Sequence, residues 1–116
     1  MNNEERTNNN RIKKVNKLLK QEISQLLLRE IDFNDILVTV TSVETSPDLR
    51  QAKIKITVIP TEKGEQALTN IKREIFVIQQ ELNKKLSLRV VPKIRFEIDQ
   101  TELKAQRIEE ILEKIK

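Results

Sequence analysis

In the stretch 43-VETSPDLRQAKI-54, a run of alternating apolar and polar residues stops, turns and starts again. Every second residue is apolar in 36–40, before the stretch, and in 52–58, where it ends. Such a period of two is typical of a strand with one buried face. Residues 46–48, Ser-Pro-Asp, supply the chemistry of a tight turn, because proline fixes its φ angle and both polar side chains can bond nearby amides. The stretch therefore predicts a β-hairpin.

Two long amphipathic segments flank this hairpin and predict helices. The first runs from about residue 10 to residue 30, with Asn10 as its N-cap, and the second from about 63 to 86. A straight helix of the second length would be ~36 Å long. A domain of this size has a radius of gyration near ~13 Å. We therefore predict that the second segment bends, or forms two helices packed at an angle.

A third strand is expected at about 91–99, where Ile94, Phe96 and Ile98 share one face. A last helix is expected at 102–116. The element order α, β, β, α with a bend, β, α indicates an α+β fold, in which helices cover one face of a three-stranded sheet. The other face is then left to solvent or to a partner.

The domain organisation expected from this pattern is simple. Residues 1–10 are polar and Asn-rich and are expected to form a disordered arm. Residues 11–99 form one domain, and 100–116 form a helical extension. No apolar run approaches the ~20 residues that span a bilayer, and the amino terminus has no apolar signal segment. We therefore expect a cytoplasmic protein that has no membrane partner.

Composition limits the chemistry that this chain can perform. The 116 residues suffice for one core without disulfides or metals. There is no Cys and no His, which removes the groups that most often serve as nucleophile, general base or metal ligand. We therefore expect a protein that is not an enzyme and has no cofactor or metal site. The net charge of +4 is compatible with a polyanionic partner such as nucleic acid.

Three segments resemble the ribosome-binding factor A family of bacterial small-subunit assembly proteins. They are the hairpin stretch 43–54, the stretch 88-LRVVPKIRFEID-99, and the basic amphipathic helix that begins at Arg11-Ile12. The resemblance covers about residues 11–99 and implies a type II KH-like domain that binds RNA and the ribosome. It also implies a monomeric factor that binds the free 30S ribosomal subunit, assists late maturation and 5′-end processing of 16S rRNA, and is associated with growth in the cold.

The sequence departs from this family between the two halves of the second helical segment. These proteins typically carry Ala-x-Gly there, in place of the Gly-x-x-Gly loop with which KH domains clamp a nucleic-acid backbone. Counting back from Val91-Pro92 places this position at Glu74-Ile75-Phe76, which contains neither Ala nor Gly. In addition, Gln79 stands where the family commonly has Arg, which removes one expected phosphate contact.

Basic residues in three groups are the candidate RNA contacts. The groups are Arg11, Lys13, Lys14, Lys17 and Lys20 on the first helix; Lys72, Arg73, Lys84, Lys85 and Arg89 on and after the second; and Lys53, Lys55, Lys93 and Arg95 on the outward side of the strands. The first group has no acidic residue among it, whereas a solvated helix face usually interleaves Glu. Unpaired basic charge favours a phosphate partner.

Simpler interpretations exist for each of these groups. A basic helix face can be merely solvated, and strand lysines can serve to prevent aggregation of sheet edges. The chain has no Trp or Tyr, and its three Phe include Phe96 in the expected core, so we expect RNA binding without base stacking. The alternative function is a non-catalytic protein-interaction module that does not contact RNA.

Overall fold

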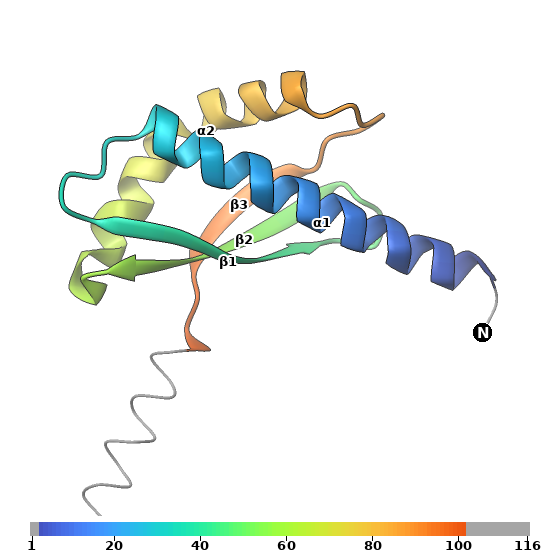
Figure 1. The fold of residues 1–116 in the computed structure, drawn as a ribbon, viewed down its shortest axis with the longest axis horizontal. Coiled ribbons are helices and arrows are strands. Elements are labelled where there is room, and N and C mark those ends of the chain that lie inside the picture. Colours follow the sequence, from blue (N-terminus) through green and yellow to red (C-terminus); the bar gives the residue numbers. More distant parts are fainter. Residues whose placement is uncertain (1–2, 102–116) are drawn as a thin grey trace, which may run out of the picture.

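The computed structural model describes residues 3–101, in which two helices pack on one face of a three-stranded sheet (Figure 1). The elements are α1 (Asn3–Glu30), β1 (Leu37–Thr45), β2 (Gln51–Ile59), a short 3₁₀ helix η1 (Thr61–Lys63), α2 (Gly64–Lys85) and β3 (Lys93–Ile98). The expected α+β class is confirmed, while the helix expected at 102–116 lies outside the described residues. None of the helices within residues 3–101 has the length and apolar character needed to cross a membrane.

The sheet has the order β1-β2-β3. β1 and β2 are antiparallel and form the predicted hairpin, while β3 runs parallel to β2. A parallel pair needs a crossover connection, which α2 supplies. Ala52, Ile54, Ile56 and Val58 on β2 are all buried, and the residues between them are at least partly exposed, which confirms the predicted alternation.

The turn of the hairpin is held by the side chains predicted to form it. The Ser46 hydroxyl donates to Asp48 Oδ1 at 2.6 Å, and the Arg50 amide donates to the same oxygen at 3.1 Å. These bonds to the carboxylate, the Ser46 hydroxyl first, lower the pKa of Asp48 below its usual value. The Lys93 amide donates to Arg50 O at 2.9 Å, so the turn also fixes where β3 begins.

A bulge in β1 explains how both Val40 and Val43 reach the core. Val40 and Val43 are both buried although they lie three residues apart, which a regular strand would not allow. Between them the register shifts, so that Val40 pairs with Ile56 and Ser42 with Lys55. Thr41 is the extra residue, and this insertion turns Val43 back toward the helices.

The first helix starts earlier than expected. We predicted a disordered arm over residues 1–10 and an N-cap at Asn10, but α1 already begins at Asn3. The expected N-cap at Asn10 is therefore wrong, and residues 3–10 are described as part of the helix. Once a helix is nucleated, each added residue costs little unless Gly or Pro interrupts it, and residues 3–30 contain neither. The helix therefore extends beyond its packed, apolar portion.

The second helix bends, as its length predicted. α2 is hydrogen-bonded as one helix from Gly64 to Lys85, and Figure 1 shows its yellow-green first half and its gold second half running in different directions. No Gly or Pro lies inside the helix after Gly64. Ile71 and Ile78, which lie on either side of its middle, are both fully buried. The bend therefore allows one apolar stripe to follow the sheet and then α1.

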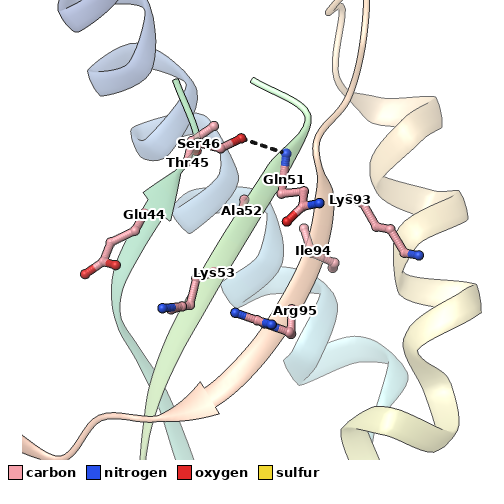
Figure 2. Close-up of a pocket in the computed structure, with 9 residues that line it drawn as sticks. All are labelled: Glu44, Thr45, Ser46, Gln51, Ala52, Lys53, Lys93, Ile94 and Arg95. Atoms are coloured by element: carbon pink, nitrogen blue, oxygen red, sulfur yellow. Dashed lines mark hydrogen bonds between the residues drawn. The ribbon is translucent and has the colours of Figure 1, made fainter. Parts of the chain in front are cut away.

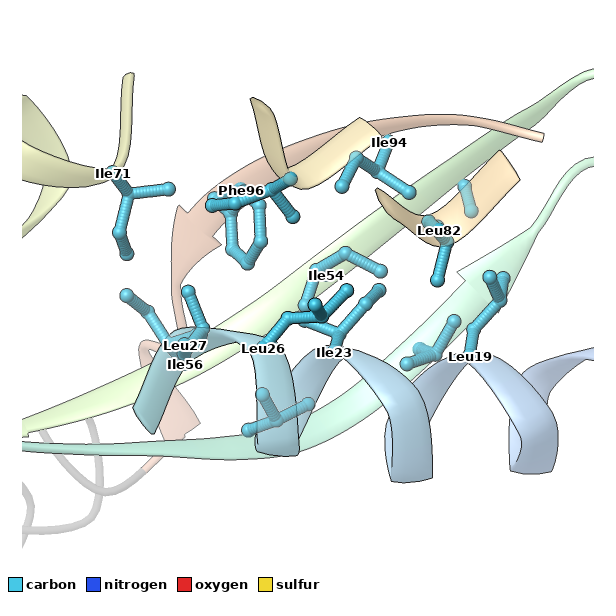
Figure 3. Close-up of a cluster of buried hydrophobic side chains, with 14 of the residues drawn as sticks. Leu19, Ile23, Leu26, Leu27, Ile54, Ile56, Ile71, Leu82, Ile94 and Phe96 are labelled. Atoms are coloured by element: carbon cyan, nitrogen blue, oxygen red, sulfur yellow. The ribbon is translucent and has the colours of Figure 1, made fainter. Parts of the chain in front are cut away.

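The core fills the space between the sheet and the two helices (Figure 3). Its largest fully buried side chains are Leu19, Ile23 and Leu26 from α1, Ile54 and Ile56 from β2, Ile71, Ile78 and Leu82 from α2, and Pro92. Burying one such aliphatic side chain stabilises the fold by ~1.5–3 kcal/mol. Phe96 lies in this core, as predicted, at 7% exposure.

Candidate nucleic-acid interface

The basic residues of α1 lie on its solvent face. Arg11, Lys13, Lys14, Lys17 and Lys20 are all exposed. The four lysines lie away from the buried stripe of Val15, Leu19 and Ile23, and Arg11, one turn before Val15, lies at its border. None of the five forms an ion pair with another residue whose side chain the structure describes. We call these five residues the α1 basic face. Charges held on a regular helix and left without counter-charge can contact several phosphates at once.

The second group does not form one site. Lys85 pairs with Glu22 of α1, with 3.8 Å between Nζ and Oε2, and so ties the two helices together. Lys84 lies 3.8 Å from Glu81 one turn earlier and is highly exposed, so this contact adds little stability. Lys72 and Arg73 lie on the outer side of the first half of α2, and Arg89 is exposed in the loop before β3.

The third group shares the open face of the sheet, as predicted. On β2 and β3 the residues that alternate with the buried ones point away from both helices. Two of the four cations are paired across strands: Lys55 Nζ lies 3.3 Å from Glu44 on β1, and Lys53 Nζ lies 3.8 Å from Glu97 on β3. The positive charge of this face is therefore partly neutralised within the sheet.

A shallow groove of about 520 Å³ crosses this open face near the hairpin turn. Its floor is formed by the ends of the three strands, and its cations are Lys53, Lys93 and Arg95. Figure 2 shows Lys53 and Arg95 next to each other on the side of the sheet away from α1. Three of the four predicted residues therefore line the groove, while Lys55 lies further along β2, beside Glu44.

Gln79 has a structural role that sequence reasoning missed. Its Nε2 donates to Pro92 O at 3.0 Å, and the Ile94 amide donates to its Oε1 at 2.9 Å. The side-chain amide thus bonds the backbone on both sides of Lys93, where β3 begins. We predicted only that Gln79 lacks the phosphate contact of an Arg. The structure gives it a different task, which is to attach α2 to β3.

Phe76 is a second residue to which the sequence analysis gave no place in the fold. Its side chain is 71% exposed on the outside of α2, in contrast to the buried Phe96. A signal was present in the sequence, because position 76 falls off the stripe formed by Ile71, Ile78 and Leu82. A large exposed aromatic on an otherwise amphipathic helix marks a candidate contact surface.

One carboxylate on the described chain has a strongly lowered pKa. Asp99 follows β3, and its carboxylate accepts a hydrogen bond from the Thr41 hydroxyl at 2.7 Å and from the Thr101 amide at 2.9 Å. These bonds, with Thr41 first, lower the pKa of Asp99 to about 2. Since Thr41 is the bulge residue of β1, the bond joins the two outer strands. It is a structural contact and holds no reacting group.

No group of three or more acidic side chains in the described part of the chain is placed to hold a metal ion. The recurring feature of the surface is exposed basic charge on a rigid framework. Such charge can bind an extended polyanion through its phosphates, with little reading of base sequence.

Comparisons with known proteins identify the family of this chain. The family model described as ribosome-binding factor A matches residues 11–112. A ribosome-binding factor A of Prochlorococcus marinus (strain NATL1A) is 35% identical over 90% of this chain and 89% of its own length. The protein of the same name from Thermodesulfovibrio yellowstonii is 32% identical over 91% of each chain.

Solved structures of this family share the fold. The crystal structure of ribosome-binding factor A from Thermus thermophilus aligns with a TM-score of 0.67 at 21% identity, covering 75% of this chain and 94% of that one. A homology model of the Thermus thermophilus factor, fitted into a cryo-EM map of its complex with 30S, aligns at 0.62, with 21% identity over 73% and 91% of the two chains. With the sequence matches over most of its length, the chain belongs to the ribosome-binding factor A family.

Proposed function

We propose that this protein binds the free 30S ribosomal subunit and assists late maturation of 16S rRNA, including processing of its 5′ end. It acts by docking and catalyses no reaction itself. Family membership supports this function, as does the Thermus thermophilus factor fitted into a map of a 30S complex. The single structural observation that carries it is the α1 basic face, five exposed cations without an ion pair to the described side chains.

The α1 basic face lacks counter-charge within the described part of the chain. Lys13 and Lys17 are four residues apart on α1, and Lys17 and Lys20 are three apart, so like charges face each other along the helix. Each such pair destabilises a helix by ~0.2–0.5 kcal/mol. An RNA backbone supplies phosphates at close spacing, and each contact releases condensed counterions, which favours binding. A folded rRNA surface is therefore a fitting partner for the α1 basic face.

The test is sedimentation with purified ribosomal particles at several salt concentrations. We expect the protein to co-sediment with 30S subunits, to bind whole ribosomes more weakly, and to dissociate steeply as salt rises. Preference for whole ribosomes, or no binding to 30S subunits, would overturn the proposal. In cells depleted of the protein, primer extension should show 16S rRNA with unprocessed 5′ ends. Normal 5′ ends there would contradict the role in maturation.

A protein-interaction module without RNA contact is the second candidate. The exposed Leu28 of α1, at 80% exposure, is the observation that favours it, since a protein partner would bury such a side chain. Binding to 30S subunits that is insensitive to salt and is lost in Leu28→Ser, but retained when α1 lysines are neutralised, would support this alternative. The reverse pattern supports docking on RNA.

A further inference from the structure

The outer stripe of α2 contains an aromatic ring that the fold itself does not use. Phe76 is 71% exposed, and Val77 beside it is 38% exposed. Of the three Phe in the chain, Phe96 is buried and Phe33 packs partly against the core. Leaving a ring in water forgoes the ~1.5–3 kcal/mol that its burial would provide. A partner that covers Phe76 would recover this free energy.

The neighbours of Phe76 on the helix surface are basic. Arg73 and Lys72 precede it by three and four residues, the spacings at which helical side chains share a face, and both are exposed. Neither forms an ion pair with another described side chain. Gln80, one turn after Phe76, is exposed as well. The nearby Glu74 and Glu81 are only partly exposed, and by helical periodicity they lie to one side of this stripe.

The ring is also held on a rigid support. On the buried side of the same turns, Ile71 and Ile78 are fully buried. Gln79 fixes this part of α2 to the start of β3 by two hydrogen bonds. Phe76 therefore projects from a backbone that cannot shift easily, and binding would not need to order it first.

These features favour an RNA base over a protein surface. Protein interfaces are enriched in aromatic residues and in Arg but depleted in Lys at their centres, so Lys72 is the neighbour that sets this surface apart from a protein interface. Here an isolated ring and one Val are accompanied by two cations that pair with no described side chain. Aromatic rings stack on unpaired bases while nearby Lys and Arg contact the backbone, which is how single-stranded nucleic acid is commonly held.

We propose that Phe76 is a stacking platform for one unpaired RNA base, with Lys72 and Arg73 binding the adjacent phosphates and Gln80 able to bond a base edge. This inference deepens the proposed function and rests on it, since it takes RNA as the partner. It gives the protein a second contact, separate from the α1 basic face, and a preference for RNA regions with unstacked bases.

The direct test places a fluorophore at this position. The chain has no Trp and no Tyr, so Phe76→Trp introduces its sole indole. We expect a short single-stranded RNA of mixed sequence to quench this fluorescence and polyphosphate, which lacks bases, to leave it nearly unchanged. The control is Leu37→Trp, at a position that is 59% exposed on the sheet. RNA that binds F76W without quenching its indole, or that quenches L37W equally, would overturn the proposal.

Affinities separate stacking from simple apolar contact. Phe76→Leu keeps an apolar side chain but removes the ring, and it should weaken binding of the same RNA by about tenfold. Phe76→Tyr should bind within about twofold of the wild type, because the ring is kept. Val77→Ala is the matched control and should also have little effect. Equal binding by Phe76→Leu and the wild type would exclude stacking, and an equal loss of RNA binding in Val77→Ala and Phe76→Leu would mean that apolar contact, and not the ring, holds the RNA, which would also overturn the proposal.

Binding of the same variants to purified 30S subunits distinguishes this inference from the proposed function. If the wild type binds subunits and Phe76→Leu binds them and the RNA equally well, only the stacking proposal fails. If the wild type does not bind subunits at all, the proposed function fails, and the fluorescence of F76W with free RNA still decides whether a ring at this position stacks on bases.

Discussion

The α1 basic face and the open face of the sheet look alike in the sequence and differ in the fold. Each has a cluster of Lys and Arg, but the five cations of the α1 basic face form no ion pairs with described side chains, whereas Lys53 and Lys55 each face a glutamate from a neighbouring strand. Neighbours along one helix face come from nearby in the sequence, and a distant one is added only where a second helix packs against it, as Glu22 does for Lys85. Cross-strand neighbours are set by the register of the sheet. The number of Lys and Arg residues in a stretch of sequence therefore predicts the unpaired positive charge of a helix better than that of a sheet.

The largest expected effect is the loss of 30S binding when charge is removed from the α1 basic face. Lys13→Gln, Lys17→Gln and Lys20→Gln together should weaken 30S binding by about 100-fold near physiological salt and reduce the salt slope by about three. The matched control is Lys53→Gln with Lys55→Gln, which should weaken binding by less than about threefold because each cation already has a partner. Sedimentation or fluorescence anisotropy across a salt series measures both. Equal losses would remove the distinction between the two faces.

The next effect is a loss of stability at the start of β3, which we expect to leave binding to 30S unchanged. Gln79→Ala leaves the Ile94 amide and the Pro92 carbonyl without their partner, which should lower the free energy of unfolding by about 1–3 kcal/mol. Gln80→Ala, at the next and exposed position, should change it by less than about 0.5 kcal/mol. Urea unfolding at pH 7 checks both. Binding of folded Gln79→Ala to 30S should be unchanged, and a large loss would mean that the start of β3 contacts the subunit.

A smaller effect is expected when the acidic partners on the open face of the sheet are removed. Its lysines are then unpaired, like those of the α1 basic face. Glu44→Gln with Glu97→Gln removes the partners of Lys55 and Lys53, and RNA affinity should rise by about fivefold if RNA reaches this face. Glu62→Gln with Glu65→Gln changes the net charge equally at exposed positions elsewhere and serves as the control. An equal rise in both double variants would mean that only net charge matters.

The smallest effect is a shift in titration at the end of the sheet. Thr41→Val removes the strongest bond to the Asp99 carboxylate, so the pKa of Asp99 should rise from about 2 toward its ordinary value of 3.8. Because the folded-state pKa is lowered, this bond stabilises the protein above that ordinary value and its contribution is lost as pH falls toward 2. Carboxyl-carbon NMR titration measures the pKa directly. An unchanged pKa of Asp99 in the variant would mean that the hydrogen bond from the Thr101 amide, and not the one from Thr41, lowers it.

Much of the fold could be predicted because local periodicity encoded it. The alternation in 52–58 determined which side of β2 is buried, and the length of the second helical segment required a bend. The start of α1 could not be predicted in the same way, since residues 3–10 lack the apolar stripe that defines the rest of the helix. Helix propagation there depends on the helix that follows, and not on the local pattern.

The candidate site was less predictable, because its decisive features join distant residues. The positions of the basic groups followed from helix and strand periods, but the pairing of Lys53 with Glu97 depends on the register between β2 and β3. The two hydrogen bonds made by Gln79 depend on where the loop before β3 passes α2. The exposure of Phe76 follows from the helical period, since position 76 lies off the stripe of Ile71, Ile78 and Leu82, but the sequence analysis did not derive it.

The amide of Gln79 has a consequence for how this protein meets its neighbours. β3 is an edge strand, and the outward N–H and C=O groups of such a strand are a template on which another chain can extend the sheet. Gln79 occupies the N–H of Ile94 and the C=O of Pro92, which are the groups that an added strand would use first. A side chain thus takes the place of a neighbouring strand and closes that end of the edge. Another chain therefore cannot add a strand at that end of β3 without first displacing the Gln79 side chain.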